Sequence, residues 1–149
     1  MDESIEVLRR LWYDEKPEFS GRFHTVRGVD AYPRPVQRPV PLLVGGRSTP
    51  ALRRAVQRGN GWIGPAMTTD DVKSVMAELR RVADQVDRPV GLGQLEITVS
   101  APGRLTPQLV SDYAALGVDR LIVYPHPTDD GIEATLSGAC AAVEGGARR

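Results

Sequence analysis

Residues 44–50, which read Val-Gly-Gly-Arg-Ser-Thr-Pro, are the best candidates for chemistry in this sequence. Gly45 and Gly46 follow a short apolar run and let the main chain approach a ligand closely, while Ser48 or Thr49 can cap a helix that starts at the next proline. The free N–H groups of that helix end, its positive dipole and the guanidinium of Arg47 favour an anion such as a phosphate. A tight turn with a solvated arginine is the alternative, since the sequence has neither an alternating glycine fingerprint nor a P-loop consensus.

Three further side chains lie in or just after predicted strands and are weaker candidates. The indole of Trp62 can form a wall for a planar ring, although a core tryptophan has the same pattern. Arg104 can reach an anionic tail. His126, held between two prolines, can donate a proton or a hydrogen bond, or can be an exposed loop histidine.

Other reactive residue types favour structural roles. Glu96 has no second carboxylate nearby in the sequence, so we expect an arginine partner or a solvated face and no paired acid and base. Cys140 lies among alanines and is predicted to be a small buried hydrophobic residue. His24 is predicted to lie at the surface. One cysteine and two histidines cannot make a structural zinc site, and no metal site is predicted.

Composition narrows the class of protein. The 149 residues include 19 basic and 19 acidic side chains, so no general attraction to nucleic acid or to an anionic membrane is expected. An apolar content of 41% predicts a packed core. The single cysteine cannot form an internal disulfide, and no signal peptide or long apolar run is visible. We therefore expect a soluble cytoplasmic protein in a reducing compartment.

The elements that position these residues alternate between strand and helix patterns. Asp2 can cap a first helix, and the prolines of residues 33–41 predict an extended connector. Apolar runs then predict strands at residues 42–44, 62–63, 95–99 and 121–124, each followed by a helical stripe. Thr68 and Asp71 resemble a capping box. Residues 145–149 are expected to be a frayed tail.

This alternation predicts an α/β fold with parallel strands and right-handed crossovers. We expect a single domain over residues 1–149, in which four βα units (42–144) follow the leading helix and connector (1–41). Four units suit a small open sheet or half of an eight-stranded barrel, which takes about 250 residues when complete. In both architectures ligands bind at the carboxyl ends of the strands.

Five blocks of the sequence, in this order, resemble the luciferase-like monooxygenases, and most of all the members that use the deazaflavin coenzyme F420. The blocks are residues 8–12, 19–23, 33–41, 44–48 and 59–62. The resemblance is nearly gapless from residue 5 to about residue 65 and continues more weakly to about residue 143.

The resemblance implies that this chain is the C-terminal half, strands five to eight, of a (β/α)8 barrel. It also implies that coenzyme F420 or FMN binds at the carboxyl ends of the strands, with its phosphate arm against Gly45, Gly46, Arg47 and Ser48; Trp62 completes the set of candidate cofactor-binding residues. Neither histidine lies at a position that matches the family's catalytic residue, so no catalytic residue is assigned.

The expected function follows from these implications. A full-length form would be an oxidoreductase that transfers hydride or activates oxygen on a small-molecule substrate, with the cofactor doing the difficult chemistry. The alternatives are a non-catalytic flavin-binding or phosphate-binding protein, or a structural partner. Since a half-barrel exposes strand edges and an apolar inner face, we expect a homodimer or association with a separate chain that supplies the first half.

Overall fold

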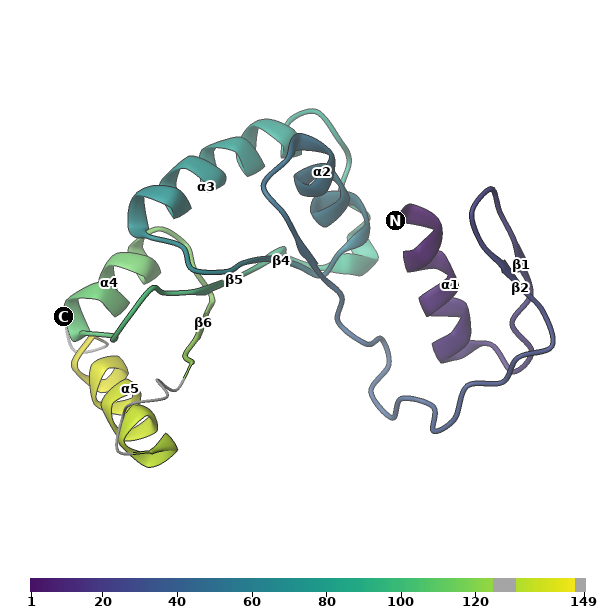
Figure 1. Ribbon diagram of the computed structural model, residues 1–149. Coiled ribbons are helices and arrows are strands. Elements are labelled where there is room, and N and C mark those ends of the chain that lie inside the picture. The colour runs from purple at the N-terminus through teal and green to yellow at the C-terminus, as the bar shows by residue number, and fades with distance from the viewer. Residues whose placement is uncertain (125–130, 147–149) are drawn as a thin grey trace. The chain divides into compact units, whose positions relative to one another are not determined.

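The computed structural model describes residues 1–124 and 131–146 (Figure 1). The chain divides into two compact units, and the boundary along the chain falls between Pro41 and Leu42. The first unit contains helix α1 (Asp2–Tyr13) and an antiparallel pair of short strands, β1 (Phe19–Ser20) and β2 (Thr25–Val26). His126 lies outside the described residues.

Glu3 ties the hairpin of the first unit to its helix. The carboxylate accepts hydrogen bonds from the backbone N–H groups of Arg22 (2.9 Å), Phe23 (2.8 Å) and His24 (3.2 Å). These bonds, with that from Phe23 the strongest, hold the pKa of Glu3 below its usual value. His24 is exposed, as predicted, and its Nε2 lies 2.9 Å from the hydroxyl oxygen of Ser4.

Two local expectations for this unit need correction. Met1, and not Asp2, occupies the N-cap of α1, and no side chain caps the helix. Asp2 lies within the first turn, where its negative charge still interacts favourably with the helix dipole. The connector contains neither helix nor strand, but it bends at residues 36–39 and does not run straight.

The second unit is built on a parallel sheet of four strands in the order β3-β4-β5-β6. Its elements, in chain order, are β3 (Leu43–Gly45), α2 (Thr49–Arg58), β4 (Gly61–Gly64), α3 (Thr69–Ala83), the short 3-10 helix η1 (Val90–Leu92), β5 (Glu96–Ser100), α4 (Pro107–Ala115), β6 (Arg120–Ile122) and α5 (Ile132–Gly146). The predicted α/β class and parallel topology are therefore confirmed.

One face of this sheet forms the core with the helices, and α2 and α3 lie on the same side of the strands (Figure 1). Val44, Trp62 and Ile97 occupy neighbouring positions on adjacent strands and are buried against the apolar stripes of α2 and α3. Complete burial of each such side chain contributes about 1.5–3 kcal/mol. The capping box predicted at Thr68 and Asp71 is present and begins α3.

The opposite face of the sheet carries a polar layer. Glu96, Thr98 and Ser100 alternate with the core residues of β5. The carboxylate of Glu96 accepts hydrogen bonds from Thr98 Oγ1 (2.9 Å) and from Arg120 Nη2 on β6 (3.1 Å). The arginine partner expected for Glu96 is confirmed.

Helix α5 packs on α4 through small residues. A Cβ atom on Gly145 would lie 2.9 Å from Cγ of Pro107, and Ser111 Oγ donates to the Gly146 carbonyl at 3.2 Å. This close approach favours glycine at residues 145 and 146. Both are helical, so the prediction that the tail frays from residue 145 was wrong for these two residues. Residues 147–149 lie outside the described part.

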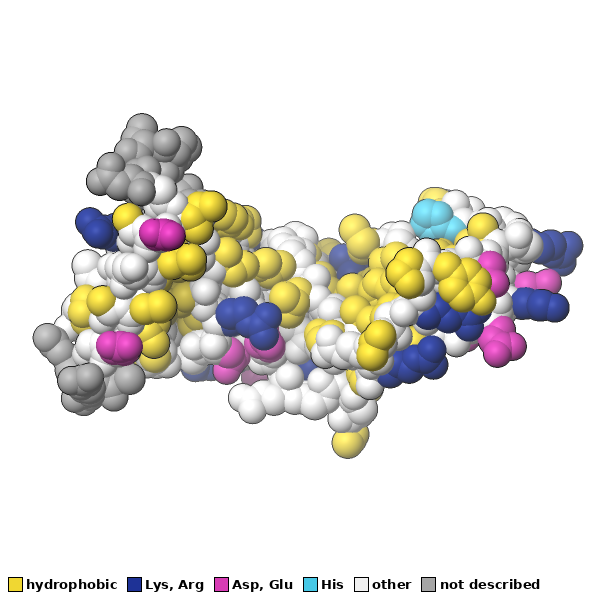
Figure 2. Space-filling model, turned by 90° about the horizontal axis from the view of Figure 1, so that it is seen from below, with side chains coloured by type: hydrophobic (Ala, Val, Ile, Leu, Met, Phe, Trp, Pro, Cys, Tyr) yellow, Lys and Arg dark blue, Asp and Glu magenta, His cyan; other side chains and the backbone are white. Residues whose placement is uncertain are grey.

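The large apolar side chains of α5 do not pack on α4 and are exposed to solvent. Ile132, Leu136, Cys140 and Val143 recur at helical spacing and are all exposed, with exposed fractions of 64%, 57% and 50% for the isoleucine, leucine and valine. Figure 2 shows apolar side chains covering much of the end where α5 lies. The expectation that Cys140 is buried was wrong, because the helix buries its Ala142 side and not this stripe.

Arg88 joins the loops at the other end of the sheet. Its guanidinium, partly buried, donates to carbonyl groups at the end of α2 and around η1, namely those of Val56 (2.7 Å), Gly59 (3.0 Å), Leu92 (3.1 Å) and Gly93 (2.7 Å). A cation at this place satisfies carbonyls that the helix leaves unpaired and interacts favourably with its dipole.

We predict that Arg88→Met lowers the free energy of unfolding by about 2–4 kcal/mol, because charge-assisted hydrogen bonds are worth about 1.5–3 kcal/mol each. Urea unfolding followed by tryptophan fluorescence measures the loss. Arg80→Met is the control, since Arg80 is exposed on α3 and makes no side-chain hydrogen bond to the described residues. Equal stability of the two variants would contradict the role of Arg88.

Candidate functional site

The carboxyl ends of the four strands share one rim of the second unit. In the parallel register Gly45 pairs with Ile63, Gly64 with Val99, and Ser100 with Ile122, so the loops that follow β3, β4 and β5 leave from the same edge. This is the edge at which parallel α/β sheets bind ligands. The site residues predicted after β3 therefore lie on the expected rim.

The first corner, residues 45–49, links β3 to α2 and is exposed throughout. Ser48 stands at the N-cap of α2 but makes no side-chain capping bond, contrary to the expectation that it would cap the helix. Thr49, the first helical residue, instead donates its hydroxyl to Glu78 Oε1 on α3 (3.2 Å). The backbone N–H groups of Ser48 and Thr49 have no acceptor among the described residues. They are free to bind an acceptor from outside.

Gly46 gives this corner its shape. Its φ of +109° lies in a region that side chains other than glycine rarely adopt, and a Cβ atom would lie 3.0 Å from Cβ of Ala51. The Gly46 carbonyl accepts a hydrogen bond of 2.8 Å from the indole N–H of Trp62. Trp62 is completely buried, so it is a core residue, as the alternative prediction for it stated. Its indole N–H fixes the position of the Gly46 carbonyl.

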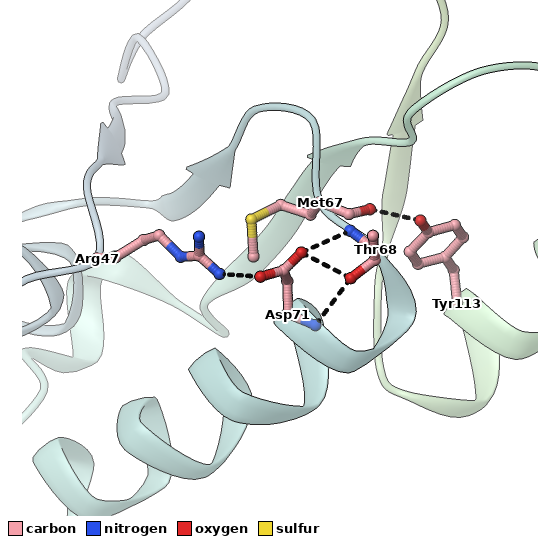
Figure 3. A network of polar contacts seen from close by, with 5 residues as sticks. All are labelled: Arg47, Met67, Thr68, Asp71 and Tyr113. Carbon is pink, nitrogen blue, oxygen red and sulfur yellow. Dashed lines mark hydrogen bonds and ion pairs between the residues drawn. The ribbon is translucent and has the colours of Figure 1, made fainter.

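The second corner, residues 64–68, links β4 to α3 and is held by β5 and α4. Ser100 accepts hydrogen bonds from Ala66 N–H on its Oγ (2.8 Å) and from Met67 N–H on its carbonyl (2.9 Å). The hydroxyl of Tyr113 donates to the Met67 carbonyl at 2.5 Å (Figure 3). Burial of that phenol raises the pKa of Tyr113. Ala66 adopts a φ of +49° between these anchors.

Arg47 and Asp71 join the two corners. Arg47 Nη2 donates to Asp71 Oδ1, while Asp71 Oδ2 accepts from Thr68 N–H (3.1 Å) and Thr68 Oγ1 (2.6 Å) (Figure 3). The hydroxyl of Thr68 and then the guanidinium of Arg47 lower the pKa of Asp71 to about 2. The carboxylate of Asp71 thus caps the start of α3. At the start of α2 the carboxylate of Glu78 reaches only the hydroxyl of Thr49, and among the described residues no acceptor reaches the backbone N–H groups of Ser48 and Thr49.

Arg104, another sequence candidate, follows β5, whose loop leaves from the same edge of the sheet. Arg104 is exposed, and its Nη2 lies 3.5 Å from the position that a Cβ atom of Gly138 on α5 would take. A polar hollow is lined by Arg53, Gln57 and residues 83–87, which include the end of α3 farthest from its capped start. None of the predicted site residues lines it. Among the described residues no group of histidine, cysteine and carboxylate side chains could hold a metal ion.

Sequence reasoning missed the partner of Arg47. Asp71 was identified only as a helix cap, and it lies 24 positions from Arg47. The two residues meet because β3 and β4 are adjacent and parallel, so the corners that follow them are neighbours. A search for opposite charges in successive strand–helix corners would have found this pair. Nothing in the local sequence marks Tyr113 as an anchor of the second corner.

Comparison with known proteins shows which family this chain resembles. A model of the luciferase-like monooxygenase family matches residues 1–108. An uncharacterized protein of Mycobacterium tuberculosis is 34% identical over 88 residues, which cover 59% of this chain and 30% of that protein. The F420-dependent glucose-6-phosphate dehydrogenase of Segniliparus rotundus is 27% identical over 94 residues, which cover 60% of this chain and 27% of the enzyme. The chain thus spans less than a third of the length of these two relatives.

Two solved structures resemble this fold. An F420-dependent secondary alcohol dehydrogenase, solved with an F420-acetone adduct, gives a TM-score of 0.54 at 21% identity and covers 76% of this chain and 34% of its own. Monooxygenase RslO1 from Streptomyces bottropensis gives a TM-score of 0.51 at 23% identity. The match covers 97% of this chain and 41% of the RslO1 chain. At these identities the likeness shows the fold alone. No helix in the described residues is long and apolar enough to span a membrane.

We predict that Gly46→Ala lowers the free energy of unfolding by about 1–3 kcal/mol, because the alanine must adopt a strained φ and crowd Ala51. Gly45→Ala is the matched control, since its Cβ would meet Ile63 at an ordinary 3.6 Å. We expect a change of about 0.5 kcal/mol or less there. Thermal and urea unfolding measure both, and a larger loss for Gly45→Ala would show that the corner is not set by Gly46.

Proposed function

Because the chain belongs to the luciferase-like monooxygenase family, as its sequence predicted, we propose that it supplies the phosphate-binding part of an F420-dependent oxidoreductase. The relatives named as F420-dependent support this cofactor, and nothing favours FMN over it. The observation that carries the proposal is the exposed first corner, where two backbone N–H groups at a helix start, beside the guanidinium of Arg47, have no acceptor in the part of the chain that the structure describes.

The first corner has the chemistry that a phosphate group requires. Ser48 and Thr49 offer backbone N–H groups, and Arg47 has guanidinium N–H groups beyond the one that Asp71 accepts. Residues 45–49 are all exposed, so the main chain of the corner is open to close approach. In this proposal Gly45, Gly46, Arg47 and Ser48 hold the phosphate arm, and Trp62 keeps the corner in place through its bond to the Gly46 carbonyl.

When bound, a deazaflavin cofactor supplies hydride transfer. The described residues of this chain contribute binding and orientation: a charged corner for the phosphate and a rim of rigid strand ends. No described residue is assigned to proton transfer or to the substrate. In this proposal those roles belong to surfaces that complete the barrel.

We also propose that the second unit is the strand-five-to-eight half of a (β/α)8 barrel. Its sheet has two edges, β3 and β6, and α2 and α3 pack on one of its faces. The exposed stripe of α5 is a further apolar surface. Unpaired edges and exposed apolar stripes favour association, and a second copy, or a separate chain with the other half, can cover them.

The cofactor proposal predicts that the chain binds F420, measured by quenching of deazaflavin fluorescence. Arg47→Ala should weaken this binding by about 1.5–3 kcal/mol, the worth of a hydrogen bond to a charged group. Arg80→Ala removes the same charge from an exposed arginine that makes no hydrogen bond to residues 45–49, and it should leave the affinity unchanged. Equal affinity of Arg47→Ala and the parent chain would remove Arg47 from the site.

The association proposal predicts a mass above that of one 16.2 kDa chain in light scattering coupled to size-exclusion chromatography. Leu136→Lys should shift the population toward the monomer, since it places a charge in the exposed stripe. Ser137→Lys places the same charge on the neighbouring side of α5 and should have little effect. A compact monomer at all concentrations, unchanged by either substitution, would contradict self-association.

A further inference from the structure

The exposed apolar stripe of α5 has carboxylates along one of its flanks. The stripe consists of Ile132, Leu136, Cys140 and Val143. Glu133 and Glu144 each follow a residue of this stripe by one position, so they lie about 100° round the helix from it, about three turns apart on the same side. Both are exposed, and neither makes an ion pair with the residues that the structure describes.

The described neighbours of α5 do not neutralise this acidic flank. Helix α4, on which α5 packs, has Asp112 as its only charged residue. Arg104 approaches α5 at Gly138, which lies two positions from a stripe residue and therefore on the other side of the helix. Arg120 of β6 is paired with Glu96. Figure 2 shows acidic side chains among the apolar ones at the end where α5 lies.

A second copy of α5 is a poor match for this surface, because it brings the same carboxylates and no basic residue. In an antiparallel pair of such helices, Glu133 of one copy would lie opposite Glu144 of the other on the same side of the seam, and like charges so placed weaken the pairing. In a parallel pair the two acidic flanks lie on opposite sides of the seam. Only the apolar stripes then hold the copies together.

We propose that the stripe of α5 is the docking surface for a helix of a different protein chain, one with apolar residues at helical spacing and lysine or arginine along one flank. The charges beside the apolar seam of two packed helices set the choice of partner. An anionic membrane attracts helices with basic flanks, so it is a poor occupant here. The inference rests on the association proposed above, since it names what covers α5, and it is independent of the cofactor.

The size of the preference follows from Coulomb's law. At a separation of about 6 Å and a water-like dielectric, one pair of unit charges changes an equilibrium constant roughly threefold at low salt. Two carboxylates should therefore strengthen the binding of a lysine-flanked helix and weaken that of a glutamate-flanked helix, each by up to about tenfold. Exposed pairs in proteins often give less, so the two helices should differ in affinity by at least about tenfold.

The test uses two fluorescein-labelled peptides of about 20 residues that share one leucine stripe at helical spacing. Lysine flanks the stripe in one peptide and glutamate in the other. Their binding to the full chain is measured by fluorescence anisotropy at low salt and at about 0.5 M salt, where charge interactions at the surface are screened.

Three variants, each checked for folding by circular dichroism, locate the effect. Glu133→Lys combined with Glu144→Lys should reverse the preference, and Leu136→Gln should weaken both peptides, because it places a polar group in the stripe. Asp84→Lys combined with Asp87→Lys is the control. It makes the same change in net charge at the polar hollow, to which α5 contributes no residue, and should leave the preference unchanged.

The parent chain should bind the lysine peptide at least about tenfold more tightly than the glutamate peptide at low salt, with a ratio close to one at about 0.5 M salt. Equal binding of the two peptides at low salt, or a preference that the substitutions at Glu133 and Glu144 do not reverse, would overturn the proposed partner. Binding that Leu136→Gln leaves unchanged would show that the stripe is not the docking surface.

Light scattering separates this inference from self-association. Excess lysine peptide should convert any assembly that forms through α5 into complexes of one chain with one peptide. An assembly that Leu136→Gln dissociates but excess peptide leaves intact would make a second copy the occupant and overturn the inference. Binding to vesicles of phosphatidylcholine and phosphatidylserine that Leu136→Gln abolishes would overturn it in favour of a membrane. A chain that is monomeric alone and prefers the lysine peptide would contradict self-association and leave the inference standing.

Discussion

The parallel pairing of β3 with β4 is the constraint on which the rest of this structure depends. It sets Val44 beside Trp62 on the helix-facing side, and it makes the starts of α2 and α3 neighbours on one rim. Two consequences follow from the same register. The indole of Trp62 reaches the Gly46 carbonyl behind the first corner, and Arg47 reaches Asp71 across to the second. A slip of one residue would exchange the faces of the strand and separate both pairs.

The two corners use the same local geometry in opposite ways. At the start of α3 the side chains of the capping box, Thr68 and Asp71, accept hydrogen bonds from backbone N–H groups of the helix end. At the start of α2 the cap residue leaves its hydroxyl unused, the second helical position is a proline, and two N–H groups have no acceptor among the described residues. An incomplete cap costs some helix stability, and in the proposed function these two N–H groups bind the phosphate.

Much of the fold was accessible from the sequence, because strand and helix periodicities, the capping box at Thr68 and the glycine corner are local patterns. Contacts between distant segments were not. The Arg47 and Asp71 pair, the carbonyls gathered by Arg88 and the exposure of Cys140 depend on which elements become neighbours. Burial of Cys140 was predicted from its alanine neighbours, but the local sequence does not indicate which side of the helix another element covers.

We propose that the first corner holds the phosphate arm of the cofactor, and backbone amide NMR tests this most directly. Titration with F420 should shift the amide resonances of Gly46, Arg47, Ser48 and Thr49 in the parent chain, with little change around the polar hollow near Asp84 and Asp87. Shifts that leave residues 46–49 unmoved, while the cofactor binds elsewhere, would contradict the account.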